Sequence, residues 1–271
     1  MVWGLLFYRG VCRFLGLCYG TAGELLKNSF GKYMGGYPIN LDITDRFCVV
    51  VGGGGVAVRK VEGLLVAGAR VRVISPRVAD QISIWAEQGA VELIRRPFAE
   101  HDVSGAFMVF AATDDPSVQD YISTCAVAAG ALLNRADTRG RSDFYLPAAC
   151  TRGDLLITVS TGGASPALAG QIRRRLEQTF GVEYALLVHL MGQIRQAIPA
   201  GGEAQPDNRQ LYFSILDSPV LTQLRNDQWA ELEKTLREML PGEIDSALLV
   251  ANTRAVAPHF VKNSGNDHDE F

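Results

Sequence analysis

Four consecutive glycines, Gly52–Gly55, separate an apolar segment from an amphipathic one. The apolar segment, FCVVV (47–51), has the length and composition of a buried β-strand. The segment after the glycines, residues 56–69, carries apolar residues at helical spacing, namely Val58, Val61, Leu65 and Ala69. The sequence therefore predicts a strand, a tight turn and a helix in direct succession.

The alternation of strands and helices continues as far as residue 134. Further apolar runs predict strands at 71–75, 91–94, 106–112 and 131–134. Helical patterns fall between them, at 78–88 and 116–129. Strands and helices that alternate in this way form right-handed βαβ units and a parallel sheet. We therefore expect an α/β fold with a Rossmann-like parallel sheet.

The glycine turn matches the pattern G-x-G-x-x-A through Gly52, Gly54 and Ala57. The first glycine permits the tight turn, the second lets a pyrophosphate approach the backbone, and the small third residue allows close packing of helix on strand. The N-terminus of the helix offers free N–H groups to the phosphates. The alternative is a glycine-rich turn without a ligand. The candidate dinucleotide-binding residues of this turn are Gly52, Gly53, Gly54, Gly55, Val56 and Ala57.

The local residues leave the kind of dinucleotide open. An acidic residue about 20 positions after the glycines usually binds the ribose of NAD. Here the second strand ends in Ser75, Pro76 and Arg77, and the first carboxylate after it is Asp80. Ser75 can hydrogen-bond a ribose, whereas Arg77 can face the 2′-phosphate of NADP.

The pattern changes after Asn134. Two segments typical of strands, 144–150 and 155–161, flank a predicted hairpin turn at 151–154. Helical patterns follow at 166–198, at 217–240 and at 243–252, and the first of them is broken near Gly181. Residues 199–208, after the first pattern, are expected to form a loop. The expected divisions are a poorly ordered extension (1–36), a dinucleotide-binding domain (37–147), a small α+β region (148–200), a C-terminal helical region (201–261) and a disordered tail (262–271).

Two further groups of polar residues follow predicted strands, at the carboxyl ends where parallel sheets of this kind bind their ligands. The first is Asn134 to Asp137, where the simpler alternative makes Asp137 a solvated loop carboxylate. The second is a hydroxyl- and glycine-rich turn that leads into a helix, and it can bind a substrate carboxylate or can be an ordinary N-cap. Its candidate substrate-binding residues are Ser160, Thr161, Gly162, Gly163 and Ser165.

Composition excludes several classes of protein. The net charge is −3 and no long basic stretch is present, so the sequence lacks the charge pattern of a nucleic-acid-binding protein. Arg9 and Arg13 interrupt the apolar N-terminal segment, which predicts neither a membrane span nor a signal peptide. The five cysteines are odd in number and lack C-x-x-C spacing, which indicates reduced thiols in the cytoplasm rather than a zinc site. The four histidines are far apart, so we assign no metal ligands.

Taken together, the motifs resemble the siroheme synthase N-terminal family, precorrin-2 dehydrogenase / sirohydrochlorin ferrochelatase. The resemblance spans about residues 37–200 and departs from the family at Gln119 and Ser142, where Asn and Cys are common. The matching segments are YPINL (37–41), VVVGGGGVAVRKVEGLLVAGARVRVISP (49–76), AATDD (111–115), NRAD (134–137), DFYLPA (143–148) and STGGASPALA (160–169).

The resemblance implies NAD as cofactor, bound at Gly52–Ala57, at Ser75–Arg77 and at Thr113 in the loop after the fourth strand. It implies that Asp137 is the catalytic carboxylate and that Asn134 lies beside the substrate. It also implies a homodimer in which residues 148–200 exchange between subunits. The implied activity is NAD-dependent oxidation of precorrin-2 to sirohydrochlorin, with ferrochelation as a second activity.

Three rival interpretations remain. An enzyme of the same fold without the ferrochelatase activity is barely distinguished by the sequence. An NAD-sensing regulatory module would use the same fold without catalysis, but it would need an effector domain or basic DNA-binding helices, and neither is evident. A general short Rossmann reductase normally carries Tyr-x-x-x-Lys, and none of the eight tyrosines has Lys four residues later.

Overall fold

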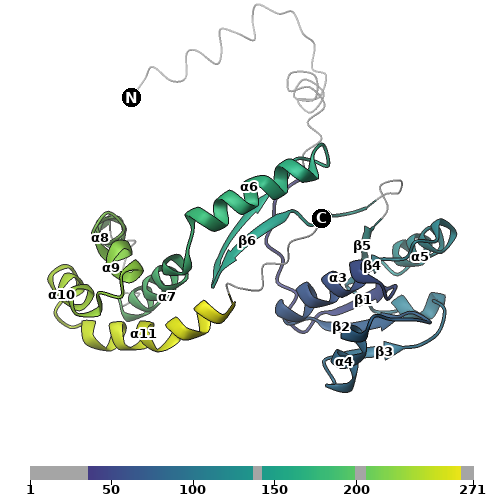
Figure 1. Ribbon diagram of the computed structural model, residues 1–271, viewed down its shortest axis with the longest axis horizontal. Coiled ribbons are helices and arrows are strands. Elements are labelled where there is room, and N and C mark those ends of the chain that lie inside the picture. Colours follow the sequence, from purple (N-terminus) through teal and green to yellow (C-terminus); the bar gives the residue numbers. More distant parts are fainter. Residues whose placement is uncertain (1–35, 137–141, 199–205, 264–271) are drawn as a thin grey trace, which may run out of the picture. The chain divides into compact units, whose positions relative to one another are not determined.

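The computed structural model describes residues 36–136, 142–198 and 206–263. The chain divides into two units, Met1–Pro38 and Ile39–Phe271. The expected extension (1–36) and tail (262–271) lie almost entirely outside the described residues. Within the second unit we describe a sheet domain, a hairpin with its helix, and a group of C-terminal helices, each by itself (Figure 1).

The sheet domain contains five parallel strands in the order β3-β2-β1-β4-β5. The strands are β1 (Phe47–Val51), β2 (Arg70–Ile74), β3 (Val91–Ile94), β4 (Met108–Ala111) and β5 (Leu132–Arg135). This order places β1 at the centre, with the chain crossing to one side and then to the other, so the carboxyl ends of β1 and β4 meet at a topological switch point. The predicted α/β fold with a Rossmann-like sheet is confirmed.

Helices cover both faces of this sheet (Figure 1). The helices α3 (Gly55–Val66) and α4 (Asp80–Glu87) bury Ala57, Val61, Leu64 and Ile82 against one face. The helix α5 (Pro116–Ala128) and the 3₁₀ turn η1 (Glu100–Val103) bury Ile122, Ala126 and Val103 against the other. Because both faces are covered, the central strands are apolar without interruption, as in Val49–Val51.

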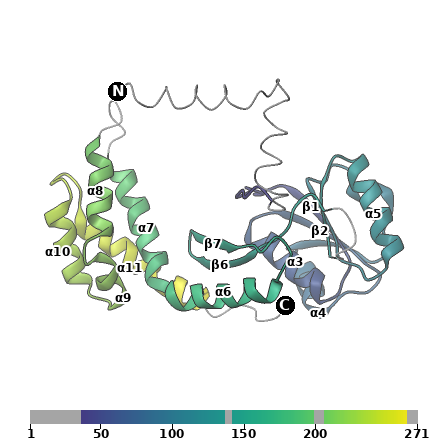
Figure 2. The same ribbon diagram turned by 90° about the horizontal axis from the view of Figure 1, so that it is seen from above.

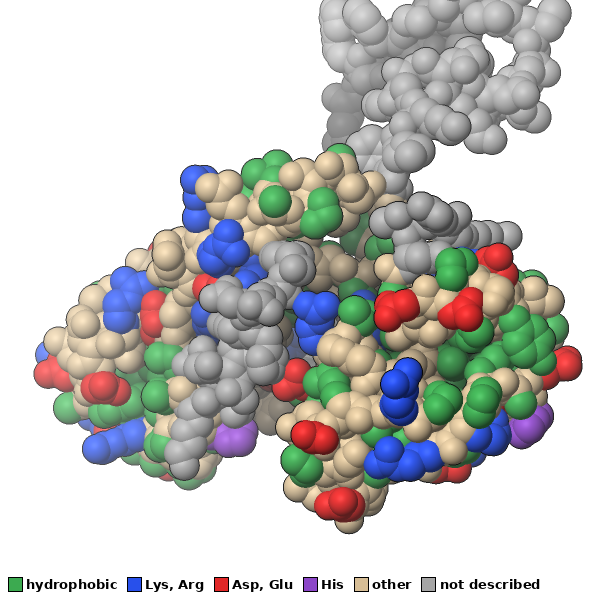
Figure 3. All heavy atoms as spheres, turned by 45° about the vertical axis from the view of Figure 1, so that its right-hand side comes forward, with side chains coloured by type: hydrophobic (Ala, Val, Ile, Leu, Met, Phe, Trp, Pro, Cys, Tyr) green, Lys and Arg blue, Asp and Glu red, His purple; other side chains and the backbone are tan. Residues whose placement is uncertain are grey.

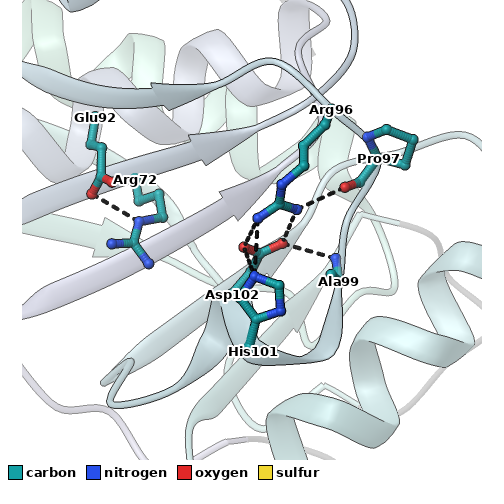
Figure 4. Close-up of polar contacts among 7 residues, drawn as sticks. All are labelled: Arg72, Glu92, Arg96, Pro97, Ala99, His101 and Asp102. Carbon is teal, nitrogen blue, oxygen red and sulfur yellow. Dashed lines mark hydrogen bonds and ion pairs between the residues drawn. The ribbon is translucent and has the colours of Figure 1, made fainter.

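The loop after β3 is held by an ion pair between the half-buried Arg96 and the buried Asp102 (Figure 4). Asp102 is 1% exposed, and its carboxylate accepts two hydrogen bonds from the Arg96 guanidinium, at 2.6 and 2.8 Å, and one from the Ala99 N–H at 2.8 Å. Burial raises the pKa of Asp102, but the hydrogen bonds from Arg96 and Ala99 outweigh it, so the pKa lies below its ordinary value. This arrangement commits Arg96 to a structural role.

The second part is the antiparallel hairpin β6 (Ala148–Arg152) and β7 (Leu155–Val159), which packs on α6 (Pro166–Thr179) (Figure 2). The turn was predicted at 151–154, but Thr151 and Arg152 belong to β6. Arg152 is buried because its guanidinium donates to the carbonyls of Phe180 and Glu177, at the end of α6. This anchoring to the helix extends the strand beyond its apolar residues.

The third part consists of helices around one core of leucines and isoleucines. They are α7 (Val182–Ala197), α8 (Pro206–Leu216), α9 (Val220–Arg225), α10 (Trp229–Met239) and α11 (Ser246–Asn263). The break predicted near Gly181 is present between α6 and α7. The core includes side chains of α7, such as Leu190 and Ile194, so α7 packs with the C-terminal helices.

Three predicted boundaries in this part are wrong. The loop predicted at 199–208 ends earlier, because Pro206 starts a helix, a position that proline tolerates well. The helical block predicted at 217–240 begins only at Val220, after Pro219, and is divided at Asp227, whose φ of 54° is incompatible with a continuing helix. The short helix predicted at 243–252 extends to Asn263, since Val256 and Phe260 pack on the core and hold the helix through Pro258.

The surface drawn in Figure 3 mixes acidic, basic and apolar side chains. Among the described residues, no helix combines the length and the apolar character needed to cross a membrane.

Candidate active site

The glycine turn between β1 and α3 is confined by its neighbours on two sides. Gly52 has φ of 127°, and a Cβ at this position would lie 2.0 Å from the carbonyl oxygen of Ala112, at the end of β4. Its N–H donates to the carbonyl of Ile74, at the end of β2, at 2.9 Å. Only glycine fits this position, because any side chain would enter the backbone of the neighbouring strand.

Gly53 joins the turn to the segment after β2. A Cβ on Gly53 would lie 2.1 Å from the carbonyl oxygen of Arg77, and the Gly53 carbonyl accepts a hydrogen bond from the Ala79 N–H at 2.8 Å. The motif assigns no role to this middle residue, so the requirement for glycine here was not predicted. It follows from the packing of two loops against each other.

Gly54 and Gly55 differ from the first two glycines because both face open space. A Cβ at either position would meet nothing within 4 Å. Gly54 is the N-cap of α3, no side chain of a described residue caps this helix, and its first turn contains no acidic residue. The first N–H groups of α3 are therefore open to an anion at the positive end of the helix dipole.

The rest of the turn completes a site for a pyrophosphate. Ala57 is fully buried against the sheet, and Val56 is exposed beside the glycines. A backbone that is open at Gly54 and fixed at Gly52 and Gly53 is what a dinucleotide pyrophosphate requires. The residues of the turn thus fit the predicted cofactor.

The segment after β2 forms a compact turn against the glycines. Ser75 is 9% exposed, and its hydroxyl donates to the carbonyl of Arg77 at 2.6 Å. The hydroxyl hydrogen is therefore already used in this bond, and the Ser75 oxygen can only accept a hydrogen bond from a ribose. Pro76 and the Arg77 side chain are exposed.

The loop after β4 is anchored by a buried glutamine that sequence reasoning did not place in the site. Gln119 is 2% exposed, and its amide nitrogen donates to the Thr113 carbonyl at 2.7 Å, while its Oε1 has no partner among the described residues. Asp115 caps α5 by accepting from the N–H groups of Ser117 and Val118. The Ser117 hydroxyl and these N–H groups lower the pKa of Asp115. The signal in the sequence was a polar residue on the buried face of α5.

Asn134 lies on β5, at the same edge of the sheet. It is 6% exposed, and its amide nitrogen donates to the Phe144 carbonyl at 3.0 Å. Phe144 in turn packs edge-on against Phe110, the register partner of Asn134 on β4. The amide therefore holds the segment that leaves the sheet. Asp137 lies outside the described residues, after Ala136, which follows β5.

Lys60 is a second residue that the sequence did not assign. Its ammonium lies 6.0 Å from the centre of the Phe110 ring, on the face of β4 that Phe144 also covers. Burial and the neighbouring charge of Arg59 lower the pKa of Lys60. No hydrogen-bond acceptor for this ammonium is found among the described residues. A cation in this position, near Asn134, suits a carboxylate ligand.

The turn that precedes α6 belongs to the hairpin part. Each of its hydroxyl oxygens accepts a backbone hydrogen bond: Ser160 from Gly162 at 3.2 Å, Thr161 from Ser165 at 3.1 Å, and Ser165 from Leu168 at 3.2 Å. The N-cap interpretation of Ser165 is thus correct. No acceptor for these three hydroxyl hydrogens is found among the described residues. Gly163 is exposed beside them.

No described group of three or more histidine, cysteine or acidic side chains is arranged to hold a metal ion. The fold and the glycine turn define a Rossmann-type NAD(P)-binding protein. A family model described as "Putative NAD(P)-binding" matches residues 39–148, and one described as "Sirohaem biosynthesis protein central" matches residues 152–179. The chain belongs to the siroheme synthase N-terminal family.

Similar proteins agree with this assignment. The siroheme synthase of Nitrosococcus oceani is 36% identical over 76% of this chain and 44% of its own length, and that of Methylococcus capsulatus is 42% identical over 74% and 42%. The chain spans less than half the length of these relatives. A solved structure of SirC, precorrin-2 dehydrogenase, has a TM-score of 0.60 and 27% sequence identity, and the match covers 70% of this chain and 96% of that one.

Proposed function

We propose that this protein is a precorrin-2 dehydrogenase that oxidises precorrin-2 to sirohydrochlorin with NAD+. The observation that carries the proposal is the open N-terminus of α3 at Gly54, built beside the carboxyl ends of β4 and β5 in a chain that matches SirC over 96% of the length of SirC. The alternative, a nucleotide-sensing module without catalysis, would need neither the Asn134 amide on β5 nor the Asp137 carboxylate after it.

The reaction removes one hydride and one proton from precorrin-2. NAD+, when bound, would supply the hydride acceptor. The N–H groups at the start of α3 would hold its pyrophosphate, and we expect the segments at Ser75–Arg77 and at Thr113 to contribute further contacts to the dinucleotide. We expect the carboxylate of Asp137 to accept the proton as general base.

The substrate is a polycarboxylate that also carries N–H groups in its macrocycle, and three groups of the chain suit it. We expect the hydroxyls of Ser160, Thr161 and Ser165 and the Lys60 ammonium to bind its carboxylates. We expect the Asn134 amide oxygen, a hydrogen-bond acceptor, to accept from an N–H of the macrocycle. The Lys60 ammonium is partly desolvated, which strengthens an ionic contact with a substrate carboxylate.

A homodimer is part of the proposal. The hairpin and its helix expose Leu156 (44%) and Leu168 (47%), and the segment leading into β6 exposes Tyr145 (76%) and Leu146 (53%). A two-stranded hairpin is marginally stable alone, and a second subunit would cover these side chains. A cytoplasmic location fits the free thiols of Cys48, Cys125 and Cys150.

The test is incubation of the purified protein with precorrin-2 and NAD+, following the absorbance of sirohydrochlorin and of NADH together. We expect equal amounts of the two products. Asp137→Asn should lower kcat about 100-fold or more, the usual scale for loss of a general base, with NAD+ affinity unchanged. Asp143→Asn is the control, because the Asp143 carboxylate already accepts the Leu133 N–H. Normal turnover by Asp137→Asn would remove Asp137 from the mechanism.

The same incubation tests the other parts of the proposal. Ferrous iron added after the oxidation reports ferrochelation through the conversion of sirohydrochlorin to siroheme. Light scattering on the purified protein gives the mass in solution. NAD+ binding without any oxidation of precorrin-2 would favour the nucleotide-sensing module.

A further inference from the structure

The end of β2 is chemically unusual for a site that binds NAD alone. In such sites a carboxylate at this position accepts hydrogen bonds from the ribose hydroxyls and repels the 2′-phosphate of NADP. Here the strand ends at Ile74 and is followed by Ser75, Pro76 and Arg77, and the first acidic residue is Asp80, in the first turn of α4. The group that usually excludes NADP is missing.

The backbone of Arg77 is fixed at the edge of the cofactor site. Its carbonyl accepts the Ser75 hydroxyl at 2.6 Å and lies against Gly53, where a Cβ would approach it to 2.1 Å. The Ala79 N–H donates to the Gly53 carbonyl from the other side of Arg77. Contacts to the strand and to the glycine turn thus hold Arg77 from both sides, close to the loop that receives the pyrophosphate.

The Arg77 side chain, by contrast, is exposed, and no described residue forms a hydrogen bond or ion pair with its guanidinium. The other charges nearby are few. Arg95 follows β3, next to the Ile94 carbonyl that accepts the Ser75 N–H, and donates to the Ser83 hydroxyl at 2.9 Å. Arg96 is committed to Asp102 (Figure 4), and the exposed Asp80 is the carboxylate that opposes them.

We infer that this cofactor site accepts NADP+ as well as NAD+, and that Arg77 is the residue that binds the 2′-phosphate. An arginine on a fixed backbone with an unpaired guanidinium suits a phosphate, because the fork of donors matches the phosphate oxygens. Arg95 supplies a second positive charge at longer range. The inference depends on the proposed function only in one respect, namely that the glycine turn is the cofactor site. It concerns the binding of the cofactor rather than turnover.

The experiment measures binding of four ligands to the full chain by calorimetry: NAD+, NADP+, 5′-AMP and 2′,5′-ADP. We expect NADP+ to bind within about tenfold of NAD+, and 2′,5′-ADP to bind more tightly than 5′-AMP. Arg77→Ala should weaken NADP+ and 2′,5′-ADP about five- to tenfold more than it weakens NAD+ and 5′-AMP, as expected when one exposed charge-assisted contact to the 2′-phosphate is lost. Arg77→Lys should retain part of the preference for 2′,5′-ADP over 5′-AMP.

Arg174→Ala is the matched control, since Arg174 is an exposed arginine on α6. Equal losses of affinity for all four ligands in Arg77→Ala would show that Arg77 supports the shape of the turn and does not bind the 2′-phosphate. That result would overturn the inference. An NADP+ affinity far below that of NAD+ in the wild type would overturn it as well. Failure of every ligand to bind would instead refute the glycine turn as a nucleotide site and, with it, the proposed function.

Discussion

The N-termini of α3 and α6 are both preceded by glycine-rich turns, yet they are built in different ways. At α3 the turn is shaped by backbone contacts around Gly52 and Gly53, and none of the described side chains caps the helix. At α6 the Ser165 hydroxyl caps the helix and Thr161 holds Ser165. The first leaves its N–H groups to an outside anion, whereas the second satisfies part of them internally and offers hydroxyl hydrogens instead. Whether a glycine-rich turn before a helix can bind an anion therefore depends on which of its N–H and hydroxyl groups already form hydrogen bonds within the fold.

The largest effect should come from Gly52→Val. The new side chain would overlap the Ala112 carbonyl, and valine strongly disfavours a φ of 127°. We expect a loss of about 3 kcal/mol or more in the free energy of unfolding, from the strained backbone and the overpacking together. Denaturant unfolding measures it. Stability equal to wild type would show that the turn is not confined as described.

Gly54→Val should separate binding from folding. Its Cβ points into open space, so the free energy of unfolding should change by less than about 1 kcal/mol. The branched side chain nevertheless occupies the approach of the pyrophosphate, and the dissociation constant of NAD+ should rise about 100-fold. Calorimetry on a variant with normal unfolding measures this. Retained NAD+ affinity would mean that the anion binds elsewhere.

Ser75→Asp sharpens the account of cofactor choice. The wild type should use NAD+ better than NADP+. The ratio of the two kcat/KM values should nevertheless be modest, because no carboxylate repels the 2′-phosphate of NADP+. A carboxylate at position 75 should widen the ratio of kcat/KM on the order of tenfold, or about 1.4 kcal/mol. Ser75→Asn is the control without charge. A wild-type preference for NADP+ would overturn NAD+ as the cofactor of the reaction.

The sequence predicted those parts of the molecule that depend on local pattern and backbone geometry. The strands at 47–51 and 91–94 and the start of α5 at Pro116 follow directly from apolar runs and from the preference of proline for the first turn. The role of Gly53 and the orphaned Oε1 of Gln119 depend on segments far apart in the chain meeting in space, and no spacing rule carries that information. The same holds for the extent of α11, which is set by packing of Phe260 rather than by propensity.

Ser165→Ala tests the second half of the comparison and should have the smallest effect on ligand binding. Loss of the hydroxyl removes the bond from the Leu168 N–H, and an N-cap of this kind contributes about 1 kcal/mol. If the hydroxyl also donates to a substrate carboxylate, KM for precorrin-2 should rise about threefold to tenfold with the dissociation constant of NAD+ unchanged. Ser165→Asp keeps a capping oxygen but places a negative charge there, so it should restore stability while raising KM further. An unchanged KM in both variants would show that the turn before α6 is an N-cap alone, and that α3 provides the only anion site of the two.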